Sequence, residues 1–165
     1  MKQVKFLILS GFLLASGAQL QASDFAFGLN GGMNFPMWHT DRMDPGAAAD
    51  AYWRVDPYEV RFSYAYTRAN YFSVLLGRKH FFSNATLRPF VEIAGGPVIV
   101  NSKREGLAYG LSPVGTLGAE IGINKTFSSL VALRYAGYIY FGDTKSGSWE
   151  ANHGLSLVAG VTLWF

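Results

Sequence analysis

The chain has 165 residues, half of them hydrophobic and 16% aromatic, and it contains no cysteine. This excludes a disulfide framework and any thiolate-based metal or redox site. The net charge of +3 comes from 14 basic and 11 acidic residues.

Residues 1–22 have the three-part order of a secretory signal peptide. Two lysines precede an apolar run from Phe6 to Ala15, and small residues lead to a cleavage site after Ala22. The run is shorter than the roughly 20 residues of a spanning helix, which favours a cleaved leader over an anchor. Cleavage leaves 12 basic and 11 acidic residues in the mature chain, residues 23–165. The mature chain is therefore nearly neutral and lacks the positive net charge typical of a protein that binds nucleic acid.

After the leader, polar and apolar residues alternate with a period of two, which is typical of strands with two unlike faces. Eight segments show it: Asp24–Phe35, Gly46–Val55, Tyr58–Thr67, Tyr71–Phe82, Leu87–Asn101, Leu111–Asn124, Ser129–Gly142 and His153–Phe165. Each is close to, or a little longer than, the ~9–11 residues of a tilted strand that crosses a bilayer. The sequence therefore predicts an all-β fold in one domain, residues 23–165.

The alternation separates charged from aliphatic residues. In the seventh segment, Val131 and Leu133 share one face while Ala132 and Arg134 share the other. The residues expected on the inner face of a barrel are Asp50, Arg54, Glu59, Arg61, Arg88, Glu92, Glu120 and Arg134. They could line a polar channel or a catalytic cluster, but a paired ionic core is favoured because eight strands enclose only enough space for side chains.

Soluble β-sandwiches also alternate, so the connectors carry more information. Long links at 36–45, 102–110 and 143–152 alternate with tight ones such as Asp56-Pro57 and 125–128, as in barrels of the outer-membrane type. The short link Arg68–Asn70 is the exception, and it leaves an unequal strand count or a shifted register as an alternative. Two girdles of aromatic residues are expected, one around each rim of the barrel. The first contains Trp53, Tyr58, Phe81, Phe82, Trp164 and Phe165, and the second contains Phe35, Trp38, Tyr66, Tyr71, Phe72, Tyr140 and Phe141. The prolines at 89, 97 and 113 cannot donate to a ladder, and we expect bulges there.

The leader, the eight segments and the closing "VTLWF" resemble the small outer-membrane β-barrel proteins of Gram-negative bacteria. The resemblance implies an eight-stranded antiparallel up-and-down transmembrane β-barrel in the bacterial outer membrane. It implies that Trp164 and Phe165 form a signal that the barrel assembly machinery reads. The expected partners are outer-membrane lipid and lipopolysaccharide, with a host or surface ligand at the external loops and no nucleic acid. A monomer is expected.

A second resemblance concerns enzymatic activity. "LRPFVEIAGGP" at 87–97, "VGTLGAEIGI" and "VALRYAGYIYFGD" look like the lipid A 3-O-deacylase family, which carries a His-x-Ser-Asn motif in its seventh strand. Aligned through Arg134, the motif positions hold Gly137, Ile139 and Tyr140, so neither base nor nucleophile is present. His153 and Ser156 lie on opposite strand faces.

No catalytic residue, metal ligand or cofactor is therefore predicted. The favoured function is a non-catalytic barrel that serves envelope integrity, surface adhesion or ligand binding. One alternative is a deacylase-like esterase with a relocated site, in which His153 activates Ser73, Ser112 or Ser156. The other is a secreted carrier of lipocalin type, which would need an apolar interior.

Overall fold

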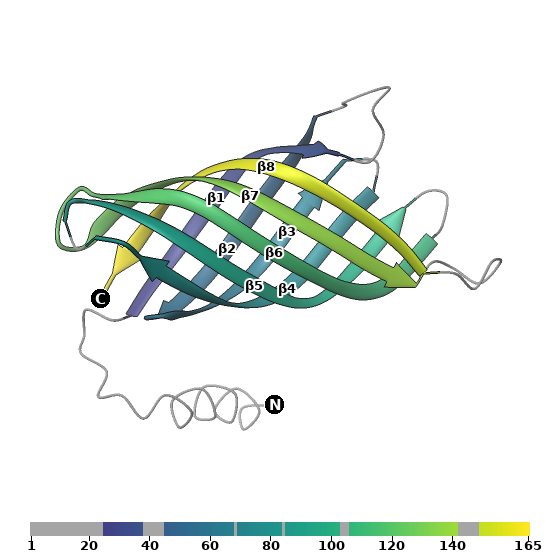
Figure 1. Cartoon of the computed structure of the whole chain (residues 1–165), viewed down its shortest axis with the longest axis horizontal. Helices are drawn as coiled ribbons and strands as arrows, with labels where there is room; N and C mark the ends of the chain where they lie inside the picture. The colour runs from purple at the N-terminus through teal and green to yellow at the C-terminus, as the bar shows by residue number, and fades with distance from the viewer. Residues whose placement is uncertain (1–24, 38–44, 68, 84, 103–105, 142–148) are drawn as a thin grey trace, which may run out of the picture.

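The computed structural model describes residues 25–37, 45–67, 69–83, 85–102, 106–141 and 149–165. The strands are β1 (Phe25–Pro36), β2 (Gly46–Val55), β3 (Tyr58–Tyr66), β4 (Ala69–Phe81), β5 (Leu87–Ser102), β6 (Gly106–Gly122), β7 (Phe127–Phe141) and β8 (Trp149–Trp164). Each pairs antiparallel with the next, and β1 pairs with β8 to close a barrel (Figure 1). The predicted all-β, eight-stranded up-and-down barrel is confirmed. In the described part of the chain, no helix is long and apolar enough to cross a bilayer.

Closure depends on the seam between the first and last strands. The pairing runs from Ala26 opposite Trp164 to Pro36 opposite Gly154 without interruption. Backbone hydrogen bonds extend it beyond both ends, from Met37 N to His153 O at 3.1 Å and from Phe165 N to Phe25 O at 3.0 Å. Each strand therefore has two neighbours, and the sheet has no free edge.

The strands differ in length from those expected. β6 begins at Gly106 rather than Leu111, and β8 begins at Trp149 rather than His153, so two of the expected long links are shorter. The glycines around residues 106–110 suggest a turn, but Leu107 and Tyr109 face outward on either side of the buried Ala108. The resulting barrel is uneven, with 17 residues in β6 and 9 in β3. The expected signal peptide lies outside the described residues.

The expected bulges at the prolines are wrong. Pro113 lies opposite Gly95, and on its other side the β6–β7 pairing resumes in the same register after a short gap. A Cβ built on Gly137 would lie 3.2 Å from the Pro113 ring, so glycine leaves room for that ring. Pro97 lies in a similar gap between β4 and β5. Missing ladder bonds, rather than extra residues, accommodate these prolines.

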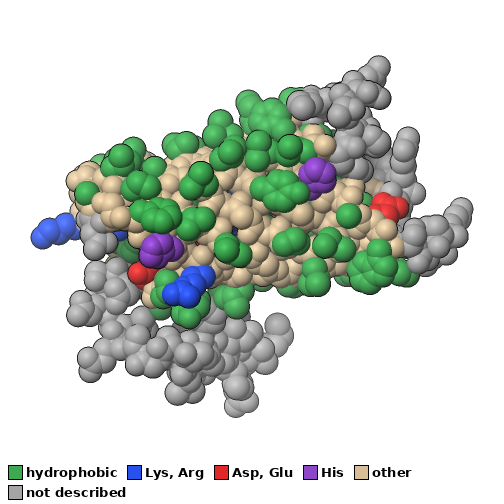
Figure 2. Space-filling view, in the orientation of Figure 1, with side chains coloured by type: hydrophobic (Ala, Val, Ile, Leu, Met, Phe, Trp, Pro, Cys, Tyr) green, Lys and Arg blue, Asp and Glu red, His purple; other side chains and the backbone are tan. Residues whose placement is uncertain are grey.

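The outer wall is apolar, and Figure 2 shows hydrophobic side chains along the visible face with charged groups only near its two ends. The membership of the two aromatic girdles was only partly predicted. Tyr71 and Tyr140 are buried in the interior, whereas Tyr109 and Trp149 face outward. Trp38 lies outside the described residues. The outward-facing aromatic residues of the prediction include Trp53, Tyr58, Tyr66, Phe72, Phe82, Phe141 and Phe165.

Candidate functional site

The barrel interior holds the predicted polar residues, which come from five strands. Strict alternation turns them inward, and side-chain exposure is zero for Arg54 and Glu120 and 24% for Arg88. The members are Asp50 and Arg54 on β2, Glu59 and Arg61 on β3, Arg88 and Glu92 on β5, Glu120 on β6 and Arg134 on β7. Buried charges are costly unless paired, so their contacts decide what the interior can do.

Glu120 is the centre of the first cluster, at the end of the barrel where β1 begins and β8 ends (Figure 1). Both terminal nitrogens of Arg54 donate to its Oε2 at 3.2 Å. Arg88 Nη2 donates to its Oε1 at 2.9 Å, and the Ser128 hydroxyl donates to the same oxygen. One carboxylate thus holds two guanidinium groups from different strands.

Trp164 closes this end of the lumen. Its ring centroid lies 4.4 Å from Arg54 Cζ and 4.8 Å from Arg88 Cζ, within the range of cation–π attraction. Its Nε1 donates to Ser128 Oγ at 3.0 Å. The Trp164 side chain therefore packs against the buried charged residues. The expectation that Trp164 belongs to a lipid-facing aromatic girdle is wrong.

A second cluster surrounds Arg61. Its Nη2 donates to Glu59 Oε1 at 2.5 Å and to both oxygens of Glu92 at 2.7 Å. Lys79 Nζ lies 3.2 Å from Glu59 Oε2 and 4.5 Å from the Phe90 ring centroid. The sequence prediction missed Lys79, although it shares a strand face with Ser73 and lies on the face opposite to Phe72 and Val74.

Asp50 and Arg134 form a third cluster at mid-height. Arg134 Nη1 donates to the two Asp50 oxygens at 2.8 and 2.7 Å, and Ser63 Oγ donates to Oδ1 at 2.7 Å. Asn30 Nδ2 lies 3.5 Å from the other oxygen. These contacts join four strands across the lumen.

Aromatic and amide groups fill the end of the barrel opposite the Glu120 cluster. Tyr71 and Tyr138 stack with ring centroids 4.2 Å apart. Asn152 Nδ2 donates to the hydroxyls of Tyr71 at 3.2 Å and Tyr140 at 2.6 Å. Interior cavities beside Arg134 and beside Asn152 have volumes of only about 10 Å³ each, about enough for one water molecule. Side chains therefore fill the described interior around Arg134 and around Asn152.

The positions considered for catalysis do not come together in the described residues. Gly137 pairs with His153 across the β7–β8 ladder, and Ile139 faces outward. The His153 ring packs 5.8 Å from the outward-facing Tyr135 ring, while Ser156 Oγ donates inward to Asn34 Oδ1 at 3.0 Å. Ser73 and Ser112 are buried in the interior, and no cluster of metal-ligating side chains occurs in the described ranges.

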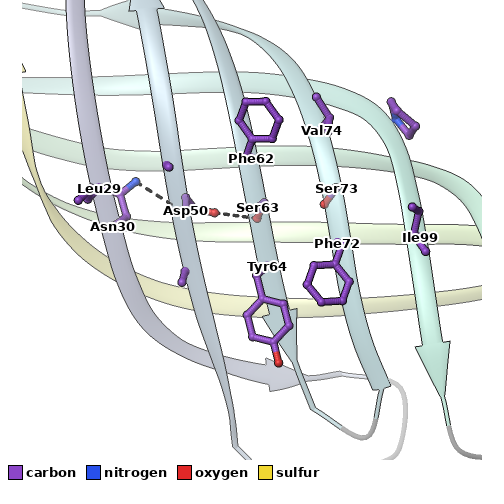
Figure 3. Close-up of a pocket in the computed structure, with 13 residues that line it drawn as sticks. Leu29, Asn30, Asp50, Phe62, Ser63, Tyr64, Phe72, Ser73, Val74 and Ile99 are labelled. Carbon is purple, nitrogen blue, oxygen red and sulfur yellow. Dashed lines mark hydrogen bonds between the residues drawn. The ribbon is translucent and has the colours of Figure 1, made fainter.

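The outer wall carries a groove of about 660 Å³ over β1 to β5 (Figure 3). Two cross-strand rows border it. One runs from Leu29 through Ala51 and Phe62 to Val74, and the next from Ala49 through Tyr64 and Phe72 to Ile99. The polar residues Asn30, Asp50 and Ser63 in Figure 3 are hydrogen-bonded to one another on the inner face. The groove surface is therefore almost entirely apolar.

Comparison with known proteins was made at three levels. No family model and no curated protein sequence matches the chain. Among solved structures, Neisserial surface protein A (NspA) aligns with a TM-score of 0.64 at 13% identity, covering 87% of this chain and 98% of that one. The N-terminal β-barrel domain of Pseudomonas aeruginosa OprF aligns with a TM-score of 0.51 at 15% identity, covering 85% and 97%. At these identities the likeness shows that the chain shares the eight-stranded barrel fold of both proteins.

Proposed function

We propose that this protein is a non-catalytic barrel of the bacterial outer membrane. One end of the barrel, here called the loop end, is where β1 leads into β2, β3 into β4, β5 into β6 and β7 into β8. We propose that this end faces the cell surface. The observation that supports this proposal most directly is the placement of apolar side chains on the outside of the barrel and charged side chains on the inside. Leu133 and Val131 face outward while Arg134 is buried in the lumen, an arrangement repeated around the barrel. Water would favour the reverse, whereas a bilayer favours an apolar wall with every backbone group paired. The resemblance in fold to a Neisserial surface protein supports the same location.

The filled interior argues against two other functions. A channel needs a continuous open lumen, and the Glu120, Asp50 and Tyr71 clusters each block it with side chains from opposite strands. A lipocalin-type carrier needs an apolar chamber, and Arg61 and Lys79 occupy that space here. The surfaces left for function are the loop end and the outer wall.

The proposed partners follow from these two surfaces. The wall contacts membrane lipid, and on the loop side that lipid is lipopolysaccharide. The loop end serves envelope integrity, adhesion or binding of a surface ligand. Phe165, whose backbone extends the seam and whose ring lies 5.8 Å from that of Phe25, is the residue proposed to report a completed last strand to the assembly machinery.

Location is tested by fractionation. Cells are separated into periplasm, inner membrane and outer membrane, and the protein is followed on gels with and without boiling. We expect it in the outer-membrane fraction, with a folded form that migrates faster until heated because the barrel remains closed. Recovery in the periplasm without detergent would refute the membrane proposal.

A further inference from the structure

A third surface is the end of the barrel opposite the loop end, here called the turn end, where β4 leads into β5, β6 into β7 and β8 ends (Figure 1). It contains a hollow of about 800 Å³. Exposed residues form the rim, with Thr86 on one turn, Lys125 on another and Phe165 at the end of the chain. Arg88 and the buried Ser128 lie deeper. The hollow is therefore open to solvent and holds a partly buried cation.

The charges of the three ionic clusters are balanced except at the turn end. The Arg61 cluster holds two cations and two carboxylates, and the Asp50 cluster holds one of each. In the Glu120 cluster, Arg54 and Arg88 share a single carboxylate. Arg54 is fully buried, whereas the Arg88 side chain is 24% exposed and lines the hollow. The excess positive charge is thus presented to the hollow.

The hydrogen bonds of the cluster leave Arg88 with free donors. A carboxylate accepts about four hydrogen bonds, and Glu120 already accepts that many from Arg54, Arg88 and Ser128. Arg88 uses only Nη2 in this contact, and among the described residues no ion pair joins it to the terminal carboxylate of Phe165. Its Cζ lies 4.8 Å from the Trp164 ring centroid and 5.0 Å from that of Phe81, contacts that hold the guanidinium in place.

We propose that the hollow binds a carboxylate attached to an apolar group, as a small organic acid or a peptide C-terminus presents it. A carboxylate brings the single negative charge that the Glu120 cluster lacks, and its planar edge matches the free edge of a guanidinium. A phosphate monoester, with a charge of about −1.5 to −2 at neutral pH, would exceed that need. Ile123, Trp164 and Phe165 line the hollow beside Arg88 and offer contacts to the apolar group.

The site follows from the fold alone, and only its position on the periplasmic side rests on the proposed function. Its volume lies within the range of about 300–1,000 Å³ that is usual for small-molecule sites. Lys125 on the rim adds attraction for an approaching anion.

The test follows the Trp164 indole N–H, which donates to Ser128 in the hollow, by NMR. Isotope-labelled protein in zwitterionic detergent micelles is titrated with N-acetyl-leucine and with its uncharged counterpart, N-acetyl-leucinamide. The indole signal is assigned by its absence in Trp164→Phe. Arg78→Gln is the matched control, because Arg78 is an exposed arginine of β4 that does not line the hollow. Heat-modifiable migration first confirms that each variant is folded.

We expect the acid to shift this signal saturably in wild type and in Arg78→Gln, and the amide to leave it unchanged. Arg88→Gln should weaken binding of the acid by about tenfold, because the charged hydrogen bonds are lost. Arg88→Lys, which keeps the charge without the planar fork, should weaken it less. A tetrapeptide that binds more tightly than N-acetyl-leucine would assign the site to a peptide C-terminus, and equal affinities would assign it to a small acid.

Two results would overturn the proposal. One is an equal shift with acid and amide in wild type, which needs no variant to fold. The other is unchanged affinity for the acid in folded Arg88→Gln. Both leave the membrane location intact, because the titration is made in micelles and the location is tested separately by fractionation.

Discussion

Replacing Glu120 with glutamine tests whether the interior is held together by paired charge. The Glu120 side chain is fully buried and binds Arg54, which is also fully buried, as well as Arg88 and the Ser128 hydroxyl. Removing one partner of a buried pair costs about 3–5 kcal/mol, because the remaining charge stays desolvated. Glutamine keeps one acceptor oxygen, so we expect a loss near the lower end, about 3 kcal/mol.

Arg88→Met provides the comparison within the same cluster. The Arg88 side chain is 24% exposed, and its loss leaves Glu120 with Arg54 and Ser128. We expect a cost of only about 1 kcal/mol, as for a partly solvated pair. Adding Arg54→Met to Glu120→Gln should recover part of the loss, because the orphaned guanidinium is then removed.

These variants are compared by urea unfolding in phospholipid vesicles, followed by tryptophan fluorescence, with the free energy obtained by linear extrapolation. Equal costs for Glu120→Gln and Arg88→Met, or a double variant as unstable as the sum of its parts, would refute the idea that burial of the Arg54 pair sets the stability of this end.

Three further predictions follow from the seam and the lumen. Gly160→Ala should destabilise the barrel by about 1–3 kcal/mol in the same assay, because the new Cβ would lie 2.2 Å from Leu29 O across the seam; Gly115→Ala, which meets nothing within 4 Å, should not, and equal losses would contradict this. Phe165→Ser should lower the amount of heat-modifiable protein in cell membranes, whereas Ile123→Ser, at an exposed residue of a turn at the same end, should leave it unchanged on immunoblots. Wild-type protein should give no stable conductance in planar bilayers, and large steady openings would show that the lumen is not filled.

The period of two predicted the strands, and the alternating lengths of the links were needed to distinguish a barrel from a sandwich. Arg61 and Glu59 are two residues apart, so any strand assignment turns both inward together. The strand ends were less predictable. Glycines around Tyr109 are typical of a loop, but the ladder to β7 continues to the Tyr109–Phe141 pair and makes the segment a strand.

The contacts in the interior could not be predicted in the same way. Arg54 and Glu120 meet across the lumen from β2 and β6, and their common height depends on the stagger between strands, which local pattern does not encode. Tyr71 and Tyr140 were expected at a lipid interface because they lie near strand ends, yet parity turns them inward. Aromatic residues at a rim are ambiguous until the face of each strand is fixed.

The unequal strand lengths would give the protein a front and a back in the proposed membrane location. At about 3.4 Å per residue and a tilt near 40°, β3 spans about 23 Å along the barrel axis and β6 about 44 Å. If the barrel lies in the outer membrane as proposed, the short side matches an apolar band about 25 Å tall, so β6 extends beyond the lipid while β3 ends at its surface. A molecule that diffuses along the membrane surface can reach the loop end directly over β2 and β3, but meets a standing sheet from the other side. Approach to this barrel is therefore directional even though its cross-section is round.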